Sequence, residues 1–199
     1  MELKVILGVL AALMAAGSAF LYLRDIFRGN TKPHIYTWLI WAIVTVIGFL
    51  GQWVSGGGAG SWATGVTALY TIVVFLLAFK YGTTDITNFD KVCLALSLVS
   101  IAPWLLVQNI LWSVILATFT DIIGFLPTIR KTWNAPRSES LGSMFFDAAK
   151  HSISIVALQS YSMTTWLYPA GVLAAKVIII CEIVFLRFIR KRGNIALSA

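Results

Sequence analysis

This chain contains seven apolar segments. A helix needs about 20 residues to cross the hydrocarbon core of a bilayer, and each segment has this length or nearly so. The fourth segment is the shortest, with 16 residues. Because 59% of the residues are hydrophobic and only 12% are charged, an ordinary soluble domain is excluded. We therefore predict an all-α membrane protein with seven transmembrane helices. The segments are Val5–Leu23, Ile35–Trp53, Ser61–Phe79, Val92–Val107, Ile110–Ile129, Gly142–Leu158 and Thr165–Leu186.

The cationic residues give this arrangement a direction. Twelve of the 15 Lys and Arg residues lie in alternate loops and in the C-terminal tail, on one side of the predicted membrane. Lys4 lies on the other side, and Lys150 and Lys176 lie inside segments. Cytoplasmic loops are enriched in Lys and Arg, so we predict a multi-pass protein of the cell (inner) membrane, with its N-terminus outside and its C-terminus in the cytoplasm. Cations divided among short loops suit a lipid bilayer as partner and argue against nucleic acid.

The chain also shows an internal repeat. A shift of 106 residues, without gaps, lays the first three segments on the last three, together with their loops and cation clusters. Two triplets in the same orientation need an odd number of helices between them, which the fourth segment provides. We predict two parallel three-helix repeats, residues 1–82 and 109–199, joined by a loop and linker helix at residues 83–108. Identities in this register include Ala11/Ala117, Arg24/Arg130, Ala42/Ala148, Gly65/Gly171, Val66/Val172 and Ala68/Ala174.

One loop carries a motif. Gly124–Lys131, followed by Ser138–Gly142, resembles the PQ-loop signature, with Pro127 in place and Thr128 where Gln is usual. The corresponding loop of the first repeat, Arg24–Pro33, has no preceding Pro. In this motif and in its layout the chain resembles the SWEET and PQ-loop superfamily, whose members are built from parallel repeats, and a group of bacterial seven-helix proteins. The resemblance implies alternating access, with a solute between the repeats. Some relatives are non-transporting scaffolds or cargo receptors.

Pro127 has two interpretations. A proline removes an amide donor and frees the carbonyl four residues earlier, that of Ile123, so Pro127 could be a hinge in a helix that moves between two states. Alternatively, it only shapes the exit of the helix into the loop. The superfamily's sugar-binding asparagines are not seen at the matching positions of this chain.

Ionisable residues inside apolar segments are the strongest functional signal, because charges in a bilayer are costly and mark pathways or partners. All of them belong to the second repeat, whereas the first offers uncharged groups such as Thr67, Tyr70 and Thr71. Depth along the helices predicts that Asp121 and Lys176 meet near the midplane. The i, i+3, i+4 spacing places Asp147, Lys150 and His151 on one helical face. The six ionisable residues are Asp121, Asp147, Lys150, His151, Lys176 and Glu182.

The charge count allows several roles. Three carboxylates face two ammonium groups, so one acid is left over when both lysines are charged. That acid could hold a proton, pair with a protonated His151, or bind a cationic solute. The alternative is that the cluster consists of ion pairs that only hold the helices together.

From these residues we predict an integral membrane transporter of a small polar solute, with proton coupling as a hypothesis that rests on the spare carboxylate. Tyr70 and Thr67 would form one wall of its cavity, and Lys176 with Asp121 the other. Trp41 could stack on the solute or belong to the core. We expect no enzymatic activity, metal or cofactor, because no nucleophile–base set and no Cys or His metal spacing is present. A homo-oligomer is left open.

Two other functions remain as alternatives. The first is a non-transporting scaffold or cargo receptor of the same fold. The second is a retinal-binding photoprotein, in which Lys176 would carry the Schiff base and Asp121 would be the counter-ion. Against retinal, Val172 stands where a carboxylate is expected one turn earlier, and the third segment contains no acid.

Overall fold

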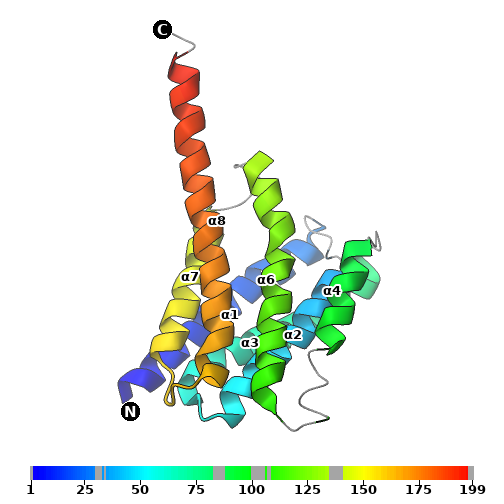
Figure 1. Ribbon diagram of the computed structural model, residues 1–199, viewed down its shortest axis with the longest axis vertical. Helices are drawn as coiled ribbons and strands as arrows, with labels where there is room; N and C mark the ends of the chain where they lie inside the picture. Colours follow the sequence, from blue (N-terminus) through cyan, green and yellow to red (C-terminus); the bar gives the residue numbers. More distant parts are fainter. Residues whose placement is uncertain are drawn as a thin grey trace.

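The computed structural model describes residues 2–29, 33, 35–82, 88–99, 106, 109–134 and 141–196. Within these ranges, residues 89, 90, 93, 96, 97, 126–128, 130, 131, 134, 143 and 190–196 are described by their backbone alone. The described residues form helices and short connections and contain no strand. The predicted all-α class is therefore confirmed (Figure 1).

The first half consists of three long apolar helices, each long and apolar enough to cross a membrane. They are α1 (Glu2–Phe27), α2 (Ile35–Val54) and α3 (Trp62–Tyr81), the last preceded by the 3₁₀ turn η1 (Gly58–Ser61). The distribution of small and large apolar residues around α1 suits a lipid environment. Its buried positions are mainly small residues such as Gly8, Ala11 and Ala15, whereas Leu13 and Phe20 on other faces are 63% and 66% exposed. Small residues between helices and large apolar residues outside are typical of membrane helices.

The second half contains α4 (Asn88–Val99), α6 (Ile110–Asn134), α7 (Leu141–Val156) and α8 (Met163–Ala196). These helices overlap the last four predicted segments, and α6 contains a shorter, predominantly apolar stretch, Ile110–Phe125. The helix α8 has 34 residues, a length of about 51 Å at 1.5 Å per residue. Its C-terminal part extends beyond the other helices in Figure 1. Pro103, in the predicted fourth segment, lies outside the described residues.

The helices pack in two groups that follow the same order. In the first group α3 packs against both α1 and α2, and in the second α8 packs against both α6 and α7. Between the groups, α1 packs on α7 and α2 packs on α6. The short α4 contacts α2 and α6. The largest apolar core lies where α2, α6 and α8 meet, with Val44, Val114 and Ile179 at its fully buried centre.

At one end, the two groups are joined by close backbone packing, which we call the closed end. Here η1 of the first group meets the α7–α8 turn of the second. The Ser154 hydroxyl donates to the Gly60 carbonyl at 2.6 Å, and the Gln159 amide donates to the Gly57 carbonyl at 3.0 Å. The Lys4 ammonium donates to the Leu158 carbonyl at 2.7 Å. Lys4, the cation set apart by the charge pattern, therefore ties α1 to the second group.

Candidate solute cavity between the two helix groups

A cavity of about 970 Å³ lies between the two groups and is lined by residues of α1, α2, α3, α6, α7 and α8. It reaches from Thr64, near the closed end, to Asp25 and Gly142 at the opposite end. Gly142 is exposed and Asp25 is half-buried, and both lie near helix ends that adjoin the basic loops. All five residues predicted to bind a solute line this cavity: Trp41, Thr67, Tyr70, Asp121 and Lys176. Their role in binding stays a prediction.

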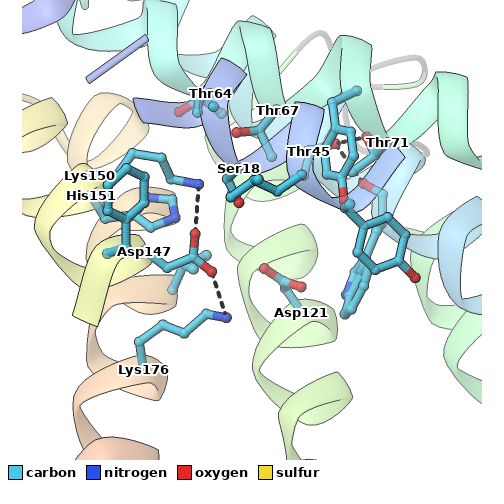
Figure 2. A pocket seen from close by; sticks show the side chains of 18 of the residues that line it. Ser18, Thr45, Thr64, Thr67, Thr71, Asp121, Asp147, Lys150, His151 and Lys176 are labelled. Atoms are coloured by element: carbon cyan, nitrogen blue, oxygen red, sulfur yellow. Dashed lines mark hydrogen bonds and ion pairs between the residues drawn. The ribbon is translucent and has the colours of Figure 1, made fainter. Parts of the chain in front are cut away.

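The second group supplies a charged wall. Asp147 pairs with two lysines through different oxygens. Its Oδ1 lies 3.4 Å from Lys150 Nζ, and its Oδ2 lies 3.1 Å from Lys176 Nζ (Figure 2). The i, i+3 pair on α7 agrees with the helical face that the sequence predicts. The exposed fractions of these side chains are 20% for Asp147, 6% for Lys150 and 14% for Lys176, so this cluster is held inside the molecule.

The predicted pairing of Lys176 with Asp121 is wrong as a direct contact. Lys176 contacts Asp147 instead, and its ammonium also approaches the sulfur of Met144 at 3.8 Å and the ring of Phe125 at 5.1 Å. The prediction used depth along each helix, which gives the height of a side chain but not its lateral neighbour. Both α6 and α7 pack on α8, but the carboxylate that reaches the Lys176 ammonium is that of Asp147 on α7.

Asp121 occupies a separate place in the cavity. Its side chain comes from α6 and is 5% exposed. Tyr168 is its hydrogen-bonding neighbour, and Lys176 acts on it electrostatically. No ion pair to Asp121 occurs among the described residues. His151 also lines the cavity, is 6% exposed, and has an Nδ1 atom without a hydrogen-bond partner in this part of the chain.

The first group supplies an aromatic wall, which the sequence reveals only in part. Trp38 lies against Tyr22, Trp41 and Tyr70, with ring centroids 4.9, 5.1 and 5.3 Å away. All four rings line the cavity. Trp38 lies near the start of the apolar segment Ile35–Trp53, a position where interfacial Trp residues are common, but it is 5% exposed and lies inside this wall. Trp and Tyr are common both at membrane interfaces and in cores, so composition alone does not separate the two positions.

Threonines complete the first wall. The hydroxyls of Thr45 and Thr71 lie 2.9 Å apart and join α2 to α3. Each hydroxyl also lies within hydrogen-bonding distance of a carbonyl of its own helix, Thr45 of the Trp41 carbonyl and Thr71 of the Ala68 carbonyl, so one of the two hydroxyls donates to the other and the second donates to its own helix. Thr67 donates to the Ala63 carbonyl at 2.8 Å. These threonines point toward the same space as the charged cluster in Figure 2.

Among the predicted residues with described side chains, Glu182 does not join the cavity wall. Glu182 lies on α8, six residues beyond Lys176, and accepts a hydrogen bond from Thr132 at 2.9 Å. It is not among the residues that line the cavity. Pro127 lies within the helical span of α6, and its side chain lies outside the described residues, so the hinge remains a prediction. The sequence analysis did not consider Pro169, which the structure places inside α8.

Metal binding has no support in the described ranges, where no group of three or more His, Cys, Asp and Glu side chains gathers. Comparison with family models, curated proteins and solved structures finds no match to this chain. The cavity and its residues therefore carry the functional argument.

Proposed function

We propose that this protein is a membrane transporter that moves a small polar solute through the central cavity by alternating access. The observation that carries the proposal is a cavity of about 970 Å³ between two helix groups, with buried ionisable side chains on one wall and aromatic rings on the other. Ligand cavities commonly have this size and combine apolar surface with a few polar groups. Buried charges in membrane helices commonly mark a solute or ion path.

We further propose that the two groups are parallel repeats of the SWEET-like type, with α4 as the linker. In each group the third helix packs against both the first and the second. If α1, α2 and α3 correspond to α6, α7 and α8, the contact between α1 and α7 is equivalent to the contact between α2 and α6, and both contacts are present. The shift of 106 residues relates four pairs of positions that all line the cavity. These pairs are Ala15/Asp121, Trp41/Asp147, Thr45/His151 and Tyr70/Lys176.

Alternating access is supported by the difference between the two ends. Hydrogen bonds and backbone contacts join the groups at the closed end, whereas the cavity extends to exposed residues at the other. The basic loops adjoin that other end, which we assign to the cytoplasm by the positive-inside rule. In this proposal Asp121 is the acid that is available to a proton or to a cationic group of the solute.

Solute counterflow in liposomes tests the proposal. The purified full chain is reconstituted and loaded with unlabelled amino acids, sugars or nucleosides, and uptake of the labelled solute is followed. We expect exchange of at least one class, and a loss of about tenfold or more in Lys176→Gln, which removes a charged contact. Glu182→Gln, outside the cavity wall, should exchange as the wild type does.

The absence of exchange for every class would contradict transport. A folded protein that binds solute without exchanging it would instead favour the scaffold or cargo-receptor function.

A further inference from the structure

The charged wall carries an uneven set of charges. Lys150 and Lys176 both lie against the single carboxylate of Asp147, at 3.4 and 3.1 Å. Each ammonium has three N–H donors. Asp147 occupies one donor on each lysine, and on Lys176 a second faces the sulfur of Met144, a weak acceptor. When both lysines are protonated, this side of the cavity has one positive charge in excess and donors to spare.

A negative charge without an ionic partner among the described residues lies on α6. Asp121 is buried, and its direct polar neighbour is the neutral hydroxyl of Tyr168. In Figure 2 its carboxyl group stands in the space between the Asp147–Lys176 pair and the threonines of α2 and α3. The cavity therefore presents a negative charge and a positive excess at two separate points.

We propose that the cavity binds a small zwitterion, whose anionic group contacts Lys150 and Lys176 and whose cationic group contacts Asp121; this rests on the proposed function. A charge that is buried without a partner is costly. A neutral solute would leave both excess charges unanswered. A solute with a single charge would answer one and leave the other. Only a solute with both charges complements the two points together.

The aromatic wall fits the same solute. Trp41 and Tyr70 line the cavity from the other group, and the faces of such rings attract cationic groups. The cavity has fewer side chains that suit the recognition of a sugar. The described lining residues include no Asn or Gln, and the single hydroxyl protons of Thr45, Thr67 and Thr71 are already donated to acceptors of the protein itself.

His151 adds to the anionic end. It follows Lys150 on α7, lines the cavity, and has no hydrogen-bond partner for Nδ1 among the described residues. Nδ1 could donate a hydrogen bond to a carboxylate oxygen when it carries the proton. The groups that we assign to the anionic end therefore all lie on α7 and α8.

Matched probes test the charge requirement on the wild-type protein. L-phenylalanine is compared with phenethylamine and 3-phenylpropionate, and L-leucine with 3-methylbutylamine and 4-methylpentanoate. Glycine betaine and D-glucose complete the set. Binding to the purified full chain is measured by calorimetry and by thermal shift. We expect at least one zwitterion to bind about tenfold or more tightly than glucose, and an amino acid to exceed both of its singly charged analogues by the same factor.

Two outcomes would overturn the inference. The first is a singly charged analogue or glucose that binds as tightly as the zwitterions do. The second is that no zwitterion of the set binds. Neither outcome depends on whether a variant folds.

Variants then locate each end of the solute. In Asp121→Asn, which keeps the size of the side chain, the preference for the zwitterion over the carboxylic acid should fall about tenfold. In Lys150→Gln, the preference over the amine should fall by a similar factor. Glu182→Gln should change neither preference. Equal losses for all three probes in either cavity variant would mean that the charge does not select the solute.

Binding and counterflow together separate this inference from the proposed function. If a zwitterion binds but is not exchanged, transport is wrong and the solute class stands. If a sugar is exchanged and no zwitterion binds, transport stands and the solute class is wrong.

Discussion

Asp147 is the residue on which the charged wall depends. Its carboxylate is the acceptor for two lysines that lie on different helices, α7 and α8. Removing one partner of a buried ion pair leaves an uncompensated charge, which costs more than the pair contributes. Asp147 therefore has a structural role whatever the solute is.

We expect Asp147→Asn to lower the free energy of unfolding by about 3 kcal/mol, because Lys150 and Lys176 lose their counter-charge inside the molecule. The measurement is denaturant or thermal unfolding in detergent. A second substitution, Lys150→Met, made in the Asp147→Asn background should restore part of the loss. Asp25→Asn is a matched control, because Asp25 pairs with Arg24 at the surface and such pairs contribute at most about 1 kcal/mol. Equal stability of Asp147→Asn and wild type would contradict this role.

At the residue scale, the charged wall was predictable, and the aromatic wall was predictable only at Trp41 and Tyr70. Asp121, Asp147, Lys150, His151 and Lys176 stand out because ionisable groups are rare in apolar segments, and all five line the cavity. The aromatic residues carry no such mark, because any helix of this class contains Trp and Tyr in several environments. Their position depends on which helix faces touch.

At the scale of elements, glycines allow close packing at the closed end, between the two groups at Gly60 and within the first group at Gly8. A Cβ atom on Gly60 would lie 2.6 Å from the backbone nitrogen of Leu158, and one on Gly8 would lie 2.5 Å from the carbonyl oxygen of Ala59. Backbone atoms cannot move aside as a side chain can. Substitution at either position therefore has to push η1 away from the element packed against it.

We expect Gly60→Ala to lower the free energy of unfolding by about 1–3 kcal/mol through overpacking. Gly124→Ala is the control, because no atom lies within 4 Å of a Cβ added there, and Ala favours the helix relative to Gly by up to about 1 kcal/mol. Both are compared by thermal unfolding in detergent. A Gly60→Ala protein as stable as the control would show that η1 can shift at little cost.

Element positions followed well from apolar segments, and element ends did not. The helix α1 begins at Glu2 where the segment begins at Val5, and α8 continues to Ala196 where the segment ends at Leu186. Charged residues such as Arg187 are good helix formers, so a helix continues where an apolar segment stops. Hydropathy indicates which part of a helix suits contact with lipid, but it does not indicate where the helix begins or ends.

At the scale of the whole molecule, alternating access requires the two groups to separate at the closed end. Gly56 and Ser160 face each other across this end, and a Cβ on Gly56 would lie 3.5 Å from the Cβ of Ser160. This separation is within the range for a disulfide.

We expect the pair Gly56→Cys and Ser160→Cys, in a Cys93→Ser, Cys181→Ser background, to form a disulfide that stops counterflow. Binding of the solute from the other end should persist, because the bond is distant from the charged wall. Reduction should restore exchange. Gly56 has a left-handed backbone, with φ of 77°, so Cys is strained there whether or not the disulfide forms. The reduced protein is therefore the matched control for that strain. Undiminished exchange in the oxidised protein would contradict separation at this end.

The division into two repeats stays a prediction from the sequence, and the contacts between the two helix groups could not be predicted at all. The shift of 106 residues defines which helices correspond. It does not specify that α1 packs on α7 or that the turn after α7 meets η1. Those contacts depend on shape complementarity, such as that at Gly60, which periodicity does not encode.

The distribution of charge has a consequence for motion. In the described part of the chain, both buried ion pairs lie within one half, Lys150–Asp147 inside α7 and Lys176–Asp147 between α7 and α8. The links across the closed end are hydrogen bonds to backbone carbonyls. In the proposed transport cycle, the halves would therefore rock apart without separating either ion pair, which would keep the electrostatic work of that motion small.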